Sequence, residues 1–309
     1  MIKTDLIEAI NACLTEDAVA EVYLKIRKKG FRKTRFENDA QNVTRDMFRK
    51  EFRDQFIDND DVMLVNYSAY EGRTKCWIEF DLDVPNDLSF FNELSQANQI
   101  EAFSFDEDKL ENIESLVIVI GNVNKRIAIY KKMSTINIFT RNTGVFVRKG
   151  DNGFVTGDIN FLRITPGIDL FYINGHLFVV KLDVLEKVFN ITDVVIKAAH
   201  REISEIEKLG LIENTKKLYE LSQDLRYARK LSRLSTISPV IRNGIPAKSI
   251  KRFASKHPTL SKLKYNQKDQ IVLDSKVSAQ LFIKMLNDDY LNSNLTRLNY
   301  ESIDKLELK

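Results

Sequence analysis

Residues 116–132 have the sequence LVIVIGNVNKRIAIYKK, in which two segments of strand character are separated by a short polar one. Leu116 to Ile120 is a continuous apolar run, which is typical of a strand covered on both faces. Arg126 to Lys132 follows at close spacing and also predicts a strand. These residues begin the densest β signal in the chain, so we work outward from them.

Further strands are predicted on both sides of this stretch, over residues 22–26, 62–70, 75–80, 135–140, 144–148, 154–156, 161–164, 169–173 and 177–182. Local turns are expected at residues 141–144, 150–153, 166–167 and 174–175. Asn174-Gly175 lies between apolar runs and is the strongest hairpin signal. Because these connections are too short for βαβ crossovers, we predict an antiparallel meander.

Helical periodicity appears near the N-terminus and again after Asp183. Phe48, Phe52 and Phe56 recur every four residues and should face the core. The predicted helices cover residues 4–13, 43–57, 184–189, 192–208, 214–234, 247–256 and 277–287. We therefore predict an α+β fold, with an antiparallel β-meander core, flanking helices and a helical C-terminal half. The expected domains are 1–182 and 183–309.

The composition excludes several classes of protein. The chain has 309 residues, of which 43% are hydrophobic, as in a soluble globular protein. Cys13 and Cys76 form no CxxC pair, which argues against a disulfide scaffold and a structural zinc site. No apolar run is long enough to span a bilayer, and the N-terminus lacks the apolar core of a signal peptide. We expect a cytoplasmic protein.

Charge is segregated between Leu225 and Lys268, a segment without Asp or Glu, although the whole chain holds 47 basic and 44 acidic residues. The cations of the segment are Arg226, Arg229, Lys230, Arg233, Arg242, Lys248, Lys251, Arg252, Lys256, Lys262, Lys264 and Lys268. Like charges at this density repel one another and need compensation. Phosphate backbones supply it, because their neutralisation releases condensed counterions.

Compensation can also come from the protein itself or from a protein partner. Residues 61–115 contain thirteen acidic and only three basic residues. This acidic segment could cover the basic one in a resting state, or face basic loops of a partner. On that hypothesis, neutralising Asp106, Glu107 and Asp108 should tighten DNA binding or release the partner.

The spacing of the cations suggests how phosphates would be held. Arg226, Lys230 and Arg233 share one side of the predicted helix 214–234, with Arg229 nearby. Lys248, Arg252 and Lys256 recur every four residues on the helix 247–256, while Ile250, Phe253 and Ala254 can pack inward. If the two helices are adjacent, they form a track for a phosphate backbone. The predicted DNA contacts are Arg226, Arg229, Lys230, Arg233, Arg242, Lys248, Lys251, Arg252 and Lys256.

These residue types favour contacts to the backbone over reading of bases. The segment has no recognition helix rich in Asn and Gln, and no zinc-finger or basic-zipper spacing. Tyr227, Phe253 and Tyr265 are too few for a single-strand stacking platform. We therefore predict binding to duplex DNA with little sequence preference.

Catalytic motifs are mostly absent. Glu79, Asp81 and Asp83 alternate and would share one face of a continued strand, where a nuclease could hold Mg²⁺. A solvated strand end explains the same residues more simply. His176, His200 and His257 are scattered and form no triad. We predict no catalytic residue, metal or cofactor, and a divalent-metal nuclease ranks last among the functions.

Two further segments carry a family resemblance. Residues 167–200, GIDLFYINGHLFVVKLDVLEKVFNITDVVIKAAH, place a strand pair before an LxxLExxF helix start, and residues 281–302 read LFIKMLNDDYLNSNLTRLNYES. This element order, over roughly the last 200 residues, resembles the KwaB-like family of the bacterial Kiwa antiphage system. The resemblance implies a DNA-binding defence protein that pairs with the small membrane protein KwaA. It carries over no contact residue.

The resemblance also implies that the membrane partner holds the protein at the inner membrane, and we expect a homodimer or larger assembly. The runner-up function is a protein-interaction module that couples to the membrane protein without binding DNA. Salt-sensitive retention on duplex DNA of any sequence would favour the first function. Stable complex formation without a DNA shift would favour the second.

Overall fold

The computed structural model describes residues 1–70, 72, 75–95, 100–134, 137–139, 147–149, 154–156, 161–293, 295–296 and 298–301. The chain divides into two compact units. The first comprises residues 1–65, 75–80 and 84–189, and the second comprises residues 66–74, 81–83 and 190–309. The connection on either side of β4 (Cys76–Glu79) therefore contributes two short segments to the second unit.

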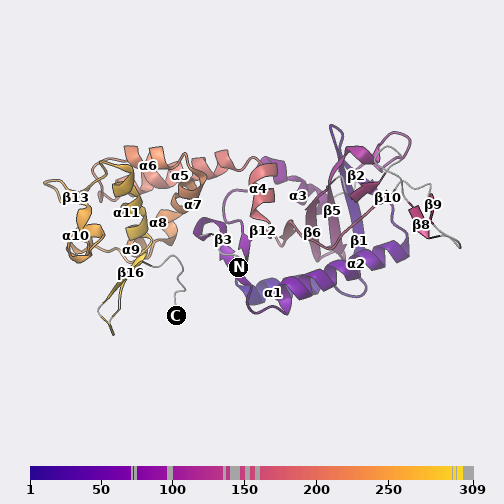
Figure 1. Ribbon diagram of the computed structural model, residues 1–309, viewed down its shortest axis with the longest axis horizontal. Coiled ribbons are helices and arrows are strands. Elements are labelled where there is room, and N and C mark those ends of the chain that lie inside the picture. Colours follow the sequence, from indigo (N-terminus) through magenta and orange to yellow (C-terminus); the bar gives the residue numbers. More distant parts are fainter. Residues whose placement is uncertain are drawn as a thin grey trace. The chain divides into compact units, whose positions relative to one another are not determined.

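An eight-stranded sheet forms the first unit, and its strands lie in the order β2-β1-β5-β6-β11-β12-β4-β3 (Figure 1). Besides β4, the strands are β1 (Val19–Ile26), β2 (Gly30–Thr34), β3 (Met63–Asn66), β5 (Ile113–Gly121), β6 (Arg126–Lys132), β11 (Leu170–Ile173) and β12 (His176–Val179). The pairings from β2 through β4 are all antiparallel, and the α+β class is confirmed. The order is not sequential, because β1 pairs with β5 and β4 joins beside β12.

The central strand β5 is covered on both faces, as its apolar run predicts. Leu116, Ile118 and Ile120 face the main hydrophobic cluster, whereas Val117 and Val119 point to the other side. All five side chains are at most 2% exposed. A strand that is apolar at every position gains by burying both sets of alternating side chains.

The predicted hairpin at Asn174-Gly175 is confirmed. Ile173 pairs with His176, so Asn174 and Gly175 form the whole turn between β11 and β12. Asn174 has φ 50° and Gly175 has φ 85°. Two consecutive residues with positive φ match the right-handed twist of the flanking strands, which explains the Asn-Gly preference.

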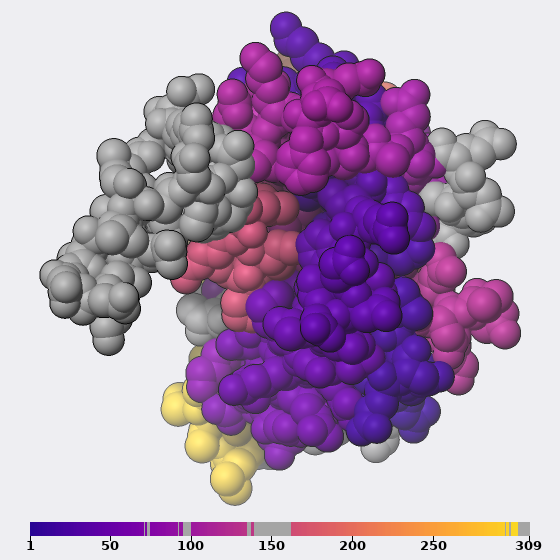
Figure 2. All heavy atoms as spheres, turned by 90° about the vertical axis from the view of Figure 1, so that its right-hand side faces the viewer, coloured from indigo at the N-terminus to yellow at the C-terminus, as the bar shows by residue number. Residues whose placement is uncertain are grey.

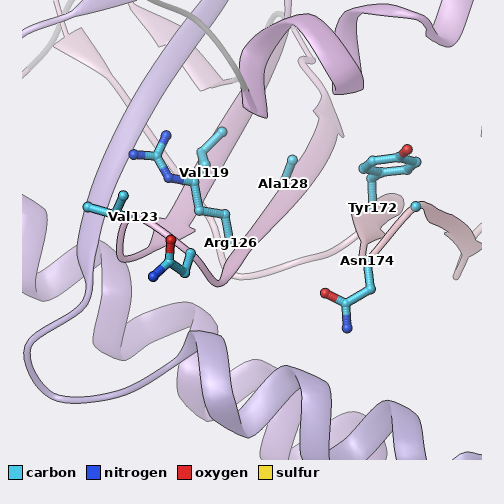
Figure 3. Close-up of a pocket in the computed structure, with 8 residues that line it drawn as sticks. Val119, Val123, Arg126, Ala128, Tyr172 and Asn174 are labelled. Atoms are coloured by element: carbon cyan, nitrogen blue, oxygen red, sulfur yellow. The ribbon is translucent and has the colours of Figure 1, made fainter.

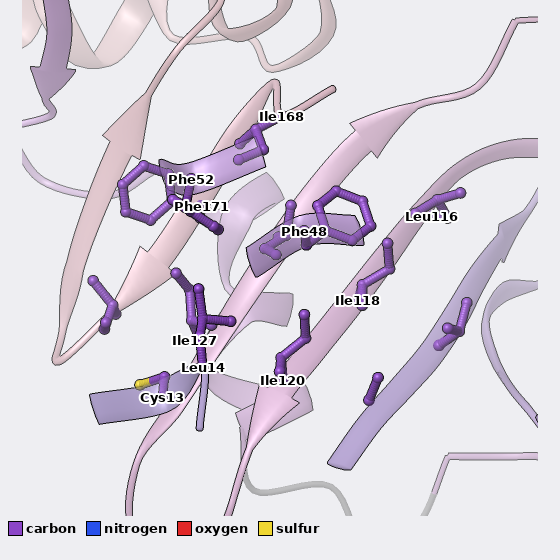
Figure 4. Close-up of a cluster of buried hydrophobic side chains, with 14 of the residues drawn as sticks. Cys13, Leu14, Phe48, Phe52, Leu116, Ile118, Ile120, Ile127, Ile168 and Phe171 are labelled. Atoms are coloured by element: carbon purple, nitrogen blue, oxygen red, sulfur yellow. The ribbon is translucent and has the colours of Figure 1, made fainter. Parts of the chain in front are cut away.

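Two N-terminal helices cover one face of the sheet. They are α1 (Lys3–Cys13) and α2 (Asn38–Phe52), and α2 continues into the π-helical turn η1 (Arg53–Ile57). Phe48, Phe52 and Phe56 are fully buried, as predicted. Phe56 stacks on Trp77 with ring centroids 4.2 Å apart, and Figure 4 shows Phe48 and Phe52 among the strand side chains. Figure 2 shows residues from the first third of the chain, in indigo to purple, in the middle of one face of this unit.

The opposite face is packed by aromatic side chains. Phe90 lies at the start of α3 (Phe90–Ser95), and Phe189 follows α4 (Leu182–Val188). The ring of Tyr130, on β6, has its centroid 6.0 Å from that of Phe90 and 5.1 Å from that of Phe189. The remaining elements of this unit are η3 (Asn86–Leu88), η4 (Leu110–Asn112), β7 (Ile138–Phe139), β8 (Val147–Lys149), β9 (Phe154–Thr156) and β10 (Phe161–Leu162).

Several predictions fall partly on residues that the structure does not describe. The turns at 141–144 and 150–153 lie outside the described residues, as do parts of the predicted strands 135–140 and 144–148. The strand predicted over 62–70 is shorter than expected. It ends at Asn66, and the 3-10 helix η2 (Tyr67–Ala69) follows it.

The second unit is mainly helical. Its elements after η2 are α5 (Thr192–Lys208), α6 (Lys216–Leu221), α7 (Leu225–Leu231), α8 (Leu234–Ile237), α9 (Pro239–Arg242), α10 (Ala247–Lys256), η6 (Leu260–Lys262), β13 (Lys264–Tyr265), β14 (Ile271–Val272), α11 (Lys276–Leu286), β15 (Tyr290–Asn292) and β16 (Asn299–Glu301). Helix α5 packs on α7 and α8, and α11 packs on α6 and α9. The predicted bounds of α5 and α10 are confirmed.

The single helix predicted over 214–234 is wrong, because two polar residues interrupt it. The carboxylate of Asp224 accepts a hydrogen bond from the backbone N–H of Arg226 and begins α7 as a separate helix. Ser232 ends α7, and its hydroxyl donates to the carbonyl of Arg229. Arg233 therefore lies beyond α7, and the four predicted cations do not share one side of a helix.

Candidate nucleic-acid interface

Helix α10 presents a row of cations on its exposed face. Lys248, Arg252 and Lys256 are all exposed, and the opposite face buries Ile250 and Ala254. Residues four apart lie about 6 Å apart along a helix axis, so the three charges form a line. Phe253 does not pack inward as predicted. Its position lies between the two faces, and 40% of its surface is exposed.

The cations of the α10 row are not paired with any acid in the part of the chain that the structure describes. Within the described ranges, no ion pair or hydrogen bond engages the side chains of Lys248, Arg252 or Lys256. The same holds for the exposed Lys262 and Lys268. Because no acid pairs with these cations there, they can bind an external anion.

Acids that follow the basic segment neutralise other cations in it. Lys251 forms an ion pair with Asp269 and lies over the ring of Tyr265, 5.2 Å from its centroid. Lys264 Nζ lies 2.6 Å from Asp274 Oδ2. The hydrogen bond to Asp274 raises the pKa of Lys264, and both side chains are exposed. Acids of the same chain therefore neutralise part of the positive charge of the segment 225–268.

Arg226 and Lys230 are two cations of α7 that differ in exposure. Arg226 is exposed, and its Nη2 donates to the hydroxyl of Tyr227 at 3.2 Å. Its guanidinium also lies 3.8 Å from the carboxylate of Asp224. Lys230 is half-buried on the same helix.

Arg229 and Arg233 are held by the short segments inserted from the N-terminal half. The guanidinium of Arg229 lies 5.3 Å from the ring centroid of Tyr67 and 5.2 Å from that of Tyr70. Arg233 Nη1 lies 3.1 Å from Asp81 Oδ2. Aromatic faces and a carboxylate are ordinary partners for guanidinium groups, so both arginines contribute to packing.

The carboxylate of Asp81 binds more than one of the neighbouring side chains. Besides Arg233, its carboxylate accepts hydrogen bonds from the backbone N–H of Ser68, at 3.0 Å, and from the Ser68 hydroxyl. Sequence reasoning missed Tyr67, Ser68 and Tyr70. Their local sequence gives no signal, because Tyr67 and Tyr70 contact Arg229, far along the chain, and Ser68 acts through Asp81, whose partner Arg233 lies 152 residues later.

The two predicted rows of cations are not adjacent. Figure 1 shows α7 and α10 at opposite ends of the second unit, with α8, α9 and α11 between them. The proposed continuous track is therefore wrong. Arg242 is exposed at the end of α9, closer in the chain to α10 than to α7.

Much of the acidic segment 61–115 has partners within the first unit, whereas Asp81 and Asp83 pair with Arg233 and Arg201 of the second unit. Arg27 pairs with Glu114, Lys29 with Asp108, and Arg32 with Glu101. These three cations lie on or next to the β1–β2 hairpin. Burial opposes the charged form of Asp108, but the hydrogen bonds from Ser104 and Lys29 hold its pKa below the usual range. Asp108 is thus a structural acid, whereas Asp106 and Glu107 are exposed.

The proposed face of three carboxylates does not form, because β4 ends at Glu79. Glu79 lies 2.6 Å from the N-terminal amine of Met1 and 2.7 Å from Nδ1 of His176. Asp81 binds Ser68 and Arg233, and Asp83 pairs with Arg201 at 2.9 Å. Among the residues that the structure describes, no three His, Cys, Asp or Glu side chains gather as a metal site.

His257 anchors the C-terminal end of α10. The residue is 5% exposed, and the centroid of its ring lies 4.8 Å from that of Tyr290 on β15. The backbone N–H of Thr259 donates to His257 Nδ1 at 3.3 Å. Burial lowers the pKa of His257, and the carboxylate of Glu301 opposes this shift only in part. The neutral ring is therefore the form that the fold favours.

A pocket of about 280 Å³ lies at the turn end of the sheet in the first unit (Figure 3). Its polar lining includes Arg126, Tyr172 and Asn174. Arg126 Nε donates to the carbonyl of Asn122 at 3.1 Å, and Nη1 lies 3.7 Å from Glu21. Because the guanidinium already has these partners, the pocket offers no uncompensated charge to a ligand.

Comparison with known proteins places the chain in a family. A protein of Escherichia coli O55:H7 (strain RM12579 / EPEC), named Kiwa protein KwaB, is 29% identical over 281 residues, which cover 88% of each chain. No solved structure matches significantly. No helix in the described part of the chain is long and apolar enough to cross a membrane. The Kiwa protein KwaB-like family model matches residues 110–296, and the chain belongs to this family.

Proposed function

We propose that this protein serves Kiwa antiphage defence by binding duplex DNA through phosphate contacts, with little sequence preference. The observation that carries this proposal is the row of Lys248, Arg252 and Lys256, which is exposed and has no ion-pair or hydrogen-bond partner for its side chains among the described residues. Membership of the KwaB-like family supports the defence role. The α10 row replaces the longer track that the sequence suggested.

Electrostatics favour a polyanion over a small acidic ligand. Three charges in line, with exposed Lys262 and Lys268 later in the segment, match a partner whose negative charge is repeated. Each phosphate neutralised releases condensed counterions, which supplies affinity without reading of sequence. Lys offers a flexible point charge, and Arg can hold phosphate with two parallel hydrogen bonds.

The family also suggests partners. We propose that the protein works in the cytoplasm as a homodimer or larger assembly, and that a KwaA-like membrane protein holds it at the inner membrane. Co-purification with that partner from detergent extracts tests this part of the proposal. Recovery of each protein alone would count against it.

A second candidate is a protein-interaction module without DNA binding. The hairpin of β15 and β16 favours it, because Leu291, Leu295, Leu298 and Tyr300 are exposed there, and Leu295 is 92% exposed. Clustered apolar side chains on a short hairpin are typical of a docking surface. A metal-dependent nuclease ranks third, since the Asp81 carboxylate already has structural partners.

The test is fluorescence anisotropy of the full-length protein with two unrelated duplexes of equal length across a salt series. If about six phosphates are neutralised, log affinity falls with log salt at a slope near −5, equally for both sequences. Adding Mg²⁺ should leave both duplexes intact. If the folded protein shows no salt-dependent binding to DNA, the proposal is wrong and the protein-interaction module becomes the favoured function.

A further inference from the structure

The connection between α9 and α10 is a fixed turn. Gly244 has φ 58°, a left-handed conformation that favours glycine. The N–H of Ile245 donates to the carbonyl of Val240, at 3.1 Å, and the N–H of Gly244 donates to that of Ile241, at 2.9 Å. This pair of bonds is the Schellman motif, which ends a helix and sets the direction of the chain that follows. Pro246 is the N-cap of α10, so the helix begins directly after the turn.

The helix before this turn is anchored to the unit. Ser238 is fully buried between α8 and α9. Its hydroxyl donates to the carbonyl of Leu286, at the end of α11, and accepts the N–H of Ile241 at 3.2 Å. Helix α9 also packs against both α8 and α11. Helix α10 therefore projects from a fixed support.

The outer face of α10 has the composition of a helix that enters a DNA groove. At 100° per residue, Ser255, Lys248, Arg252 and Lys256 occupy one continuous arc, and all four are exposed. Ile250 and Ala254 are buried on the other side. Lys248, Arg252 and Lys256 thus face outward as donors with no acid partner among the described residues, whereas the Ser255 hydroxyl donates to the carbonyl of Lys251 at 2.8 Å.

We infer that α9, the turn 243–246 and α10 form a helix-turn-helix docking unit, and that α10 lies in the major groove of the duplex. A first helix, a turn of about four residues with glycine, and an exposed second helix are the parts of such a unit. The major groove is about 12 Å wide and admits one helix. This inference rests on the proposed function and specifies how the same cations are used.

The binding mode assigns different tasks to the exposed residues. Lys248 and Arg252 lie in the middle of the arc, where they can donate to the groove acceptors O6 and N7 of guanine as well as to phosphates. Lys256, at the edge of the arc, neutralises a flanking phosphate. Since the arc contains no Asn or Gln, base discrimination is weak, in agreement with the predicted lack of sequence preference.

Filling the major groove tests the inference directly. Two duplexes of identical sequence are compared by anisotropy with the full-length protein, one with unmodified cytosine and one with glucosylated 5-hydroxymethylcytosine. The sugar projects into the major groove and leaves the minor groove and phosphates unchanged. We expect the modified duplex to bind at least tenfold more weakly.

The outcomes separate this inference from the proposed function. Equal binding to both duplexes would overturn groove docking and leave phosphate binding in place. No binding to either duplex would overturn both. As a second measure, Ser255→Glu should weaken binding to the unmodified duplex about tenfold, whereas Ser261→Glu, an exposed serine on η6, should change it less than threefold. Equal effects of the two substitutions would count against the α10 arc.

Discussion

Arg233 Nη1 lies 3.1 Å from Asp81 Oδ2, and the two residues are 152 positions apart in the chain. The side chain of Asp81 is 6% exposed, whereas that of Arg233 is 35% exposed. An arginine that was predicted to bind DNA therefore completes a carboxylate site inside its own unit. The same short segments that supply Asp81 also supply Tyr67 and Tyr70 to Arg229. The basic segment thus contains structural cations and exposed ones.

Asp81→Ala should destabilise the protein by about 1–3 kcal/mol, because Ser68 and Arg233 lose their buried acceptor. Asp83→Ala is the matched control. Its pair with Arg201 is exposed on both sides, and such pairs contribute about 0–1 kcal/mol. Urea unfolding of both variants measures the difference. Equal stability losses would contradict the structural role of Asp81.

Gly244→Ala should destabilise the α9–α10 connection by about 1 kcal/mol, since the left-handed conformation is costly for a side chain with Cβ. Space is not the problem, because a Cβ at this position would meet no atom within 4 Å. Gly244→Asn should cost less, as asparagine tolerates this conformation. Thermal unfolding ranks the three proteins. An alanine variant as stable as the wild type would argue against a fixed turn.

Acidification should weaken the anchoring of α10 through His257. Its pKa is lowered in the fold, so the unfolded chain binds the proton more readily, and stability falls as the pH drops below about 6.5. His257→Asn keeps an acceptor near Thr259 but cannot titrate. The free energy of unfolding, measured at pH 7.5 and 5.5, should fall more in the wild type than in the variant. Parallel losses would exclude His257 as the cause.

Much of the fold follows from local patterns. The apolar run 116–120, the Asn174-Gly175 turn and the phenylalanines of α2 each predict their own environment, because periodicity and turn chemistry act over a few residues. The helix predicted over 214–234 failed for a local reason as well. Asp224 and Ser232 compete for backbone groups, and this competition outweighs the leucine spacing.

The candidate site was only half visible in the sequence. The absence of acids between residues 225 and 268 identifies a basic segment, but it does not show which cations remain exposed. That depends on Asp81, Tyr67 and Tyr70, which approach from the N-terminal half. Gly244 and Pro246 are typical turn residues, but no turn was predicted at 243–246. The significance of this turn appears only once α10 is seen to expose its cations.

The most direct test of the account compares two triple variants in a duplex-DNA mobility shift across a salt series. Lys248→Glu/Arg252→Glu/Lys256→Glu reverses the α10 row, and Lys197→Glu/Lys208→Glu/Lys216→Glu makes the same charge change on exposed lysines of α5 and α6. Losing three phosphate contacts should reduce the salt slope of the α10 variant by about 2.7, whereas the control should stay near the wild-type slope. Equal binding by the two folded variants would contradict the assignment of DNA to α10.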